Sequence, residues 1–146
     1  MAVEVRWYDP EQTIILWKLI GRWTWEEFYP VYDQAIALRQ SVSHRTDSIT
    51  DFTHTSHLPP HIITHSKAIA QRRIKYDMGM NVFITYNTLL VRMFKISLTV
   101  YPFIGRNYRI VNTEAEALAL IYALRAEAAS TPAPATESDG NDARQA

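Results

Sequence analysis

Alternation between apolar and polar residues opens the chain, and it gives way to helical spacing after residue 20. Residues 3–7 (VEVRW) alternate strictly, which predicts a strand with one face exposed to water. Residues 13–20 (TIILWKLI) are apolar on both faces except for Lys18, which predicts a strand inside the sheet. The intervening residues 9–12 (DPEQ) favour a type I turn, so the two strands are expected to form a hairpin.

Signals for the start of a helix follow at Thr24. Thr24 and Glu27 have the spacing of a capping box, and Trp23 and Phe28 have that of a hydrophobic staple. We expect a helix from this point to about residue 40, in which Pro30 introduces a kink or delays the regular part.

Strands and helices then alternate, and this order implies parallel crossovers with helices packed on the sheet. The predicted fold class is α/β, with a mixed four-to-five-stranded sheet, an opening β-hairpin and four flanking helices. The remaining strands are expected at 47–53, 80–86 and 107–111, and the remaining helices at about 59–73, 88–101 and 114–128.

The chain has 146 residues, the usual length of one domain. Residues 128–146 contain no large apolar side chain and cannot offset the entropy of ordering. We therefore expect one α/β domain over residues 1–127 and a disordered tail over residues 128–146.

Charge and composition exclude several function classes. Lys plus Arg equals Asp plus Glu, at 15 each, which argues against general nucleic-acid binding. The absence of cysteine excludes disulfides, thiolate metal sites and a cysteine nucleophile. No signal-peptide pattern and no run of about 18 apolar residues is present, so we expect a cytoplasmic protein without membrane insertion.

The loop that follows the predicted strand at 47–53 is a candidate binding or phosphorylation site. Ligands collect where a parallel strand leads into a helix N-terminus, and the free N–H groups there favour an anion. Hydroxyls that only form turns and cap the helix are the alternative. The candidate residues are Thr53, Thr55, Ser56, His57 and His61.

Histidines four residues apart suggest a weaker alternative, a metal site. His61 and His65 share one helix face if the helix begins at Pro59, and His57 or Asp51 could complete a zinc or nickel shell. Solvated polar residues on an early helix turn explain the same pattern, so no metal and no cofactor is assigned.

Residues 89–101 (LLVRMFKISLTVY) are apolar around nearly the whole circumference, unlike a helix that lies on one sheet face. One interpretation is a partner or dimer surface formed by Leu90, Met93, Phe94 and Tyr101. Burial by neighbouring helices is the other. The aromatic residues Trp7, Trp17, Trp23, Trp25 and Phe28 are expected in the core, with an apolar ligand pocket as the alternative.

Nucleophile and phosphate-binding motifs are absent, so the sequence offers no support for enzyme activity. The opening segments V-R-W-Y-D-P-E-Q-T-I-I-L-W and G-R-W-T-W-E-E-F-Y, together with the element order, resemble the SpoIIAA-like small bacterial proteins of the STAS superfamily over about residues 3–125. That resemblance implies a mixed sheet flanked by helices and no enzyme activity.

Antagonist members of this family bind an anti-sigma kinase and are switched by phosphorylation of a serine at the start of their second helix. Here Ser56 is the nearest hydroxyl. The resemblance thus implies a non-enzymatic interaction module of a bacterial regulatory system that binds a protein partner. The apolar residues 89–101 add the possibility of a homodimer. The alternative is a carrier or sensor that holds a small apolar ligand or lipid between helices and sheet.

Overall fold

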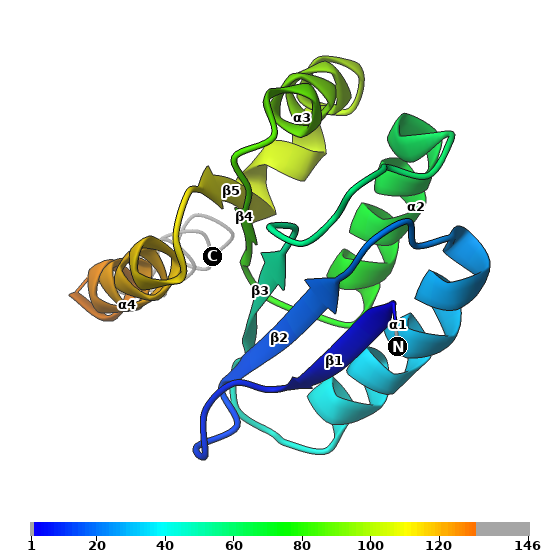
Figure 1. Ribbon diagram of the computed structural model, residues 1–146. Helices are drawn as coiled ribbons and strands as arrows, with labels where there is room; N and C mark the ends of the chain where they lie inside the picture. Colours follow the sequence, from blue (N-terminus) through cyan, green and yellow to red (C-terminus); the bar gives the residue numbers. More distant parts are fainter. Residues whose placement is uncertain (1, 131–146) are drawn as a thin grey trace, which may run out of the picture.

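Five strands form one sheet in the order of the sequence, from β1 to β5 (Figure 1). β1 pairs antiparallel with β2, and every later pair is parallel. This confirms the predicted α/β class, the hairpin and the inside position of the second strand. The computed structural model describes residues 2–130. Its elements are β1 (Val3–Trp7), β2 (Ile14–Leu19), α1 (Trp25–Gln40), β3 (Asp47–Asp51), α2 (Ile62–Lys75), β4 (Asn81–Ile84), α3 (Thr88–Val100), the 3₁₀ helix η1 (Pro102–Asn107), β5 (Tyr108–Val111) and α4 (Glu114–Ser130).

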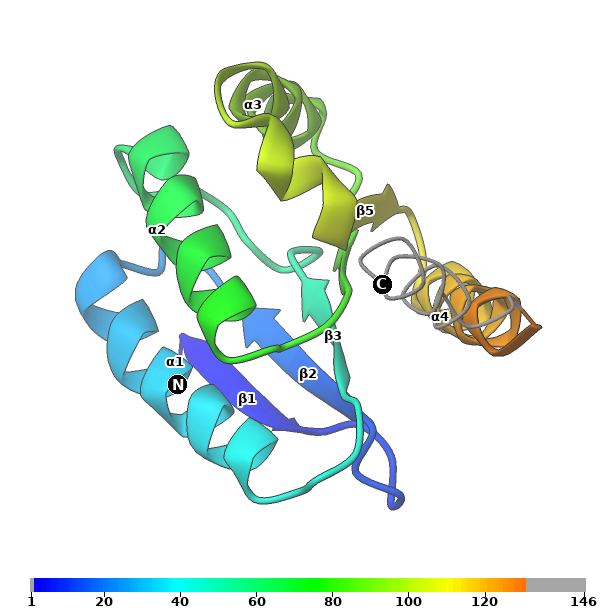
Figure 2. The ribbon, with the colours of Figure 1, turned by 180° about the vertical axis from the view of Figure 1, so that it is seen from behind.

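Three helices cover one face of the sheet and the fourth covers the other (Figures 1 and 2). α1, α2 and α3 each connect two adjacent parallel strands, and right-handed crossovers between successive neighbours put all three on the same side. α4 follows the last strand and packs on the opposite face through Ala117 and Ile121. β2 therefore contributes to two cores, with Trp17 toward α1 and Leu16 toward α4.

The predicted start of α1 is confirmed. The Thr24 hydroxyl accepts a hydrogen bond from the Glu27 backbone N–H at 3.2 Å, and the Glu27 carboxylate accepts one from the Thr24 backbone N–H at 3.0 Å. The rings of Trp23 and Phe28 lie 5.9 Å apart between centroids. Pro30 does not delay the helix, which begins at Trp25, because Pro30 is exposed and water can bond the freed carbonyl.

Two predicted boundaries are wrong. α2 begins at Ile62 rather than Pro59, because a residue before proline avoids helical geometry and His61 adopts a left-handed φ of 62°. α4 continues to Ser130 through two alanines, which are strong helix formers, so the predicted boundary at 127/128 falls inside a helix. Residues 131–146 of the predicted tail lie outside the described residues. Within residues 2–130, no helix has the length and apolarity required to cross a bilayer.

Candidate functional site

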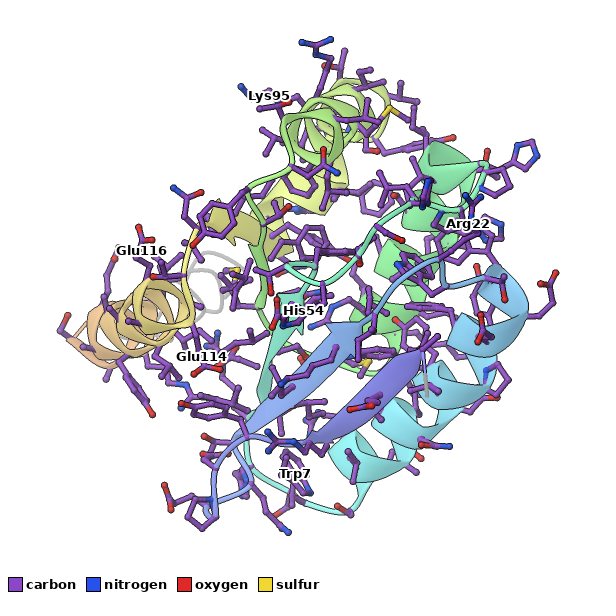
Figure 3. The ribbon with its side chains drawn as sticks, in the orientation of Figure 1. Trp7, Arg22, His54, Lys95, Glu114 and Glu116 are labelled. Atoms are coloured by element: carbon purple, nitrogen blue, oxygen red, sulfur yellow. The ribbon has the colours of Figure 1, made fainter. Side chains whose placement is uncertain are left out.

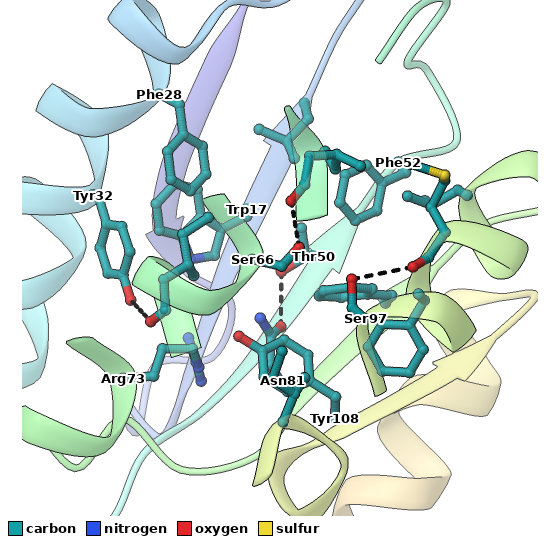
Figure 4. A pocket seen from close by; sticks show the side chains of 18 of the residues that line it. Trp17, Phe28, Tyr32, Thr50, Phe52, Ser66, Arg73, Asn81, Ser97 and Tyr108 are labelled. Atoms are coloured by element: carbon teal, nitrogen blue, oxygen red, sulfur yellow. Dashed lines mark hydrogen bonds between the residues drawn. The ribbon is translucent and has the colours of Figure 1, made fainter. Parts of the chain in front are cut away.

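A cavity of about 80 Å³ lies between the sheet and the helices α1–α3 (Figure 4). Its floor consists of alternate residues from four neighbouring strands, which share one face because side chains of a strand alternate between faces. These floor residues are Trp17 and Leu19 of β2, Thr50 of β3 and Phe52 just beyond it, Asn81 and Phe83 of β4, and Tyr108 of β5.

Helical residues spaced three and four apart form the roof, as expected for helix faces that pack on a sheet. The interior face of each helix thus points at the cavity and excludes water from most of it. The roof residues are Phe28 and Tyr32 of α1, Ile62, Ser66, Ile69 and Arg73 of α2, and Leu90, Met93, Phe94 and Ser97 of α3.

Aromatic rings make up nearly half of the residues that line the cavity. Trp17 stacks on Phe28 with centroids 5.1 Å apart, and Phe83 meets Phe52 and Phe94 edge-on at 5.2 and 5.5 Å. The sequence left open whether the aromatic residues near the N-terminus belong to the core or line a ligand pocket. In the structure most of them do both. Trp17, Trp23, Trp25 and Phe28 are packed in the core and also line the cavity, whereas Trp7 does not line it.

Polar groups gather at the end of the cavity formed by the first residues of β4 and β5. The Thr50 hydroxyl donates a hydrogen bond to the Asn81 side-chain oxygen at 2.8 Å. Asn81 stands beside Tyr108 on the adjacent strand, and burial raises the pKa of the Tyr108 phenol. Burial also raises the pKa of Tyr32, whose hydroxyl donates to the Ile69 carbonyl. Both phenols therefore stay protonated at neutral pH.

Arg73 supplies the positive charge at this end. It lies in the last turn of α2 and is 4% exposed. Figure 4 shows its guanidinium between Tyr32 and Asn81 in that view. Sequence reasoning explained this residue only as a cation that suits a helix C-terminus and missed its role in the cavity, because nothing in the local pattern distinguishes it from Arg72.

The predicted partner surface is wrong in most of its residues. Leu90 is 4% exposed, and Met93 and Phe94 face the cavity, because the sheet and α2 cover this side of α3. Tyr101 is half-buried, with the Lys67 ammonium 5.3 Å from its ring centroid. The large apolar side chains that α3 exposes are instead Leu89, Ile96 and Val100.

The predicted binding loop is anchored to its neighbours through two of its hydroxyls. The Thr55 hydroxyl donates to the Leu19 carbonyl at 2.6 Å and accepts from the Trp23 indole N–H at 3.2 Å. The Thr53 hydroxyl donates to Asp51 at 2.6 Å. These two threonines therefore stabilise the turn. Ser56, His57 and His61 are exposed, and the Ser56 hydroxyl lies 3.1 Å from His57 Nδ1.

The weak metal alternative at His57, His61 and His65 is contradicted. The His65 ring stacks on Trp25 with centroids 4.0 Å apart, and its Nδ1 shares a hydrogen bond with the Tyr29 hydroxyl. Burial lowers the pKa of His65, and the nearby His61 lowers it further. No group of three or more potential ligands occurs in the part of the chain that the structure covers. His57 precedes two prolines and lies off the helix, and the late start of α2 leaves His61 at the N-cap with a left-handed φ of 62°.

Figure 3 shows how the labelled His54 and Arg22 lie among the side chains around the sheet. Both are exposed, and neither lines the cavity. The interior cavity is therefore the candidate site that the structure adds, and the binding loop that follows β3 stays a prediction.

No known protein-family profile matches the chain, and no curated protein shows significant similarity to it. The resemblance to the STAS superfamily thus remains a prediction.

Proposed function

We propose that this protein binds a small, largely apolar molecule in the cavity between the sheet and α1–α3, as a carrier or sensor. The observation that carries the proposal is the composition of the cavity. Its walls are aromatic and aliphatic, and a few polar groups converge at one end. Ligand sites for small molecules have this composition, because the apolar walls provide affinity and the polar groups fix orientation.

The proposal involves binding without a chemical step. Among the described residues that line the cavity there is no Asp, Glu, His or Lys. General acid–base catalysis requires a group whose pKa lies near the operating pH, and the two lining phenols have pKa values raised by burial. These facts support a carrier or sensor over an enzyme.

Native mass spectrometry of the freshly purified full chain, together with thermal-shift assays on neutral apolar compounds, tests the proposal. We expect a bound small molecule or a stabilising compound. Ser66→Phe fills the cavity from α2 and should abolish the effect, whereas Thr64→Phe on the exposed side of the same helix should leave it intact. An empty spectrum combined with no shift from any compound would refute the proposal.

The protein-interaction module remains a second candidate, and so do the regulatory role and the cytoplasmic location. The exposed stripe of Leu89, Ile96 and Val100 on the outer side of α3 favours the interaction module. If the stripe is a contact surface between copies, the native chain should run as a dimer and Ile96→Glu should run as a folded monomer in light scattering. A monomeric native chain would rule out self-association.

A further inference from the structure

Arg73 is a buried cation whose hydrogen-bonding capacity is only partly used. All of its hydrogen bonds within the described residues come from Nη2. They reach the carbonyls of Met78, Gly79 and Met80 and the Ser48 hydroxyl at 3.0–3.5 Å. Its Nε is one of two buried side-chain polar atoms without a partner in residues 2–130, the other being the Thr46 hydroxyl. One edge of the guanidinium is therefore held by the protein, while Nε is left without a partner.

No carboxylate neutralises this charge among the residues that the structure describes, since none of their ion pairs includes Arg73. Asp47 precedes Ser48 in β3, but successive side chains of a strand point to opposite faces. Asp47 accordingly pairs with Arg125 of α4 on the far side of the sheet, at 2.8 Å. The C-terminal carbonyls of α2 offset part of the charge of Arg73. A buried charge without a counter-ion still costs several kcal/mol.

A second hydrogen-bond donor lies beside Arg73. Thr50 donates to the Asn81 side-chain oxygen, and Tyr108 lies opposite Asn81 on the adjacent strand. Burial raises the pKa of the Tyr108 phenol, so the phenol keeps its proton and can donate a hydrogen bond. Tyr108 and Tyr32 both line the cavity together with Arg73.

Building on the proposed binding function, we propose that the ligand is a small monocarboxylate with an apolar body, whose carboxylate pairs with Arg73 and accepts a hydrogen bond from the Tyr108 hydroxyl. Arg73 is the only charged side chain among the described lining residues, so the cavity matches a single negative charge. The remaining wall is mostly aromatic and aliphatic, which suits a short hydrocarbon body. The volume of about 80 Å³ is roughly half that of an engineered cavity of ~150 Å³ that binds benzene, so the ligand has only a few carbon atoms.

The test compares two small probes of the same shape that differ in charge, propionate and propanamide, by isothermal titration calorimetry at pH 7. The full wild-type chain should bind the carboxylate at least about tenfold more tightly, because a charge-assisted hydrogen bond exceeds a neutral one by about that factor. Arg73→Met should remove the preference and retain the binding of the amide. Arg72→Met is the matched control and should keep the preference, because Arg72 points outward to Asp33.

Arg73→Met also removes the hydrogen bonds to the carbonyls of Met78 and Gly79, so circular dichroism and thermal denaturation check that the variant folds before it is titrated. If Arg73→Met does not fold, Tyr108→Phe takes its place, since it removes the other donor and should reduce the preference.

Xenon, a small neutral probe whose binding is followed by ¹²⁹Xe NMR, separates the failure of this inference from the failure of the proposed function. Equal affinity for propionate and propanamide, or binding of xenon without binding of the carboxylate, overturns the carboxylate inference and leaves the cavity as a ligand site. Binding of none of the three probes overturns both. A preference that persists in Arg73→Met shows that another group recognises the anion, and this also overturns the inference.

Discussion

Asp47 joins three parts of the molecule through one buried carboxylate. Its side chain is 1% exposed, accepts a hydrogen bond from the Met80 backbone N–H at 2.9 Å, and pairs with Arg125 and with Arg45. Arg125 also donates to the Thr13 carbonyl, so α4 is attached to the sheet at this point.

We predict that Asp47→Asn lowers the free energy of unfolding by roughly 2–4 kcal/mol, because the charge-assisted bond to Arg125 is lost in a buried setting. Urea denaturation at pH 7 measures the change. Asp33→Asn is the control, since that carboxylate is 70% exposed and its pair with Arg72 is worth less than about 1 kcal/mol. Equal losses in the two variants would contradict the role of burial.

Gly79 connects α2 to β4 in a conformation that excludes a side chain. Its φ is 74°, and a Cβ atom there would lie within van der Waals overlap of the Thr46 carbonyl oxygen. Gly79→Ala should lower the free energy of unfolding by more than about 3 kcal/mol, whereas Gly21→Ala should cost about 1–2 kcal/mol. Gly21 also has a positive φ, 68°, but open space surrounds it, so Gly21→Ala measures the cost of backbone strain without a steric clash. Thermal denaturation of both variants makes the comparison.

The ionisation of Asp9 makes the stability of the folded protein depend on pH. Burial alone would raise the pKa of Asp9, but hydrogen bonds from the Thr13 hydroxyl and from the backbone N–H groups of Ile14 and Thr13 outweigh it and hold the pKa below its ordinary value of 3.8. A lowered pKa in the folded state stabilises the protein above pH 3.8, and this contribution is lost as the pH falls through the folded-state pKa.

Wild type should therefore be more stable than Asp9→Asn at pH 7, and the difference should shrink steadily below pH 3.8. Denaturant titrations of both proteins across this range measure it. A difference that stays constant into acid would assign the effect to the shape of the turn and not to the charge.

At the scale of the element, α3 has two apolar sides with different roles. Leu90, Met93 and Phe94 face the cavity, and Leu89 and Ile96 face outward. An apolar circumference therefore does not reveal which side is buried. Only the position of the helix between the sheet, α2 and solvent does so.

Met93→Glu should lower the free energy of unfolding by at least about 3 kcal/mol, because it places a charge in an aromatic cavity. Ile96→Glu should change it by no more than about 0.5 kcal/mol, since Ile96 is 41% exposed. Circular dichroism during denaturation measures both. Similar losses would mean that the outer side of α3 is also covered.

At the scale of the whole molecule, the two cores on either side of the sheet share β2 and β3. β3 is flanked by β2 and β4 and buried on both faces, whereas β1 and β5 are edge strands. Hydrogen exchange followed by mass spectrometry should find the slowest amides in β3 and faster exchange in β1 and β5. Faster exchange in β3 than at the edges would contradict this description of the core.

Local patterns in the sequence determined the elements and their order. The capping box at Thr24 and Glu27, the alternation in residues 3–7 and the turn at Asp9 act between residues close in the chain, so they could be read before the structure was known. The same local signals predicted an α/β fold with a hairpin and parallel crossovers. They failed at the start of α2, where the left-handed His61 is not encoded by any pattern that we recognised.

Tertiary structure alone decided where the site lies. Thr50, Arg73, Asn81 and Tyr108 come from four elements and meet only because neighbouring strands bring alternate side chains to one face beneath α2. Burial, which gives Arg73 its unpaired charge and Tyr108 its raised pKa, depends on the whole chain and not on neighbours in sequence. The sequence by itself thus determined the framework, and long-range packing determined the cavity.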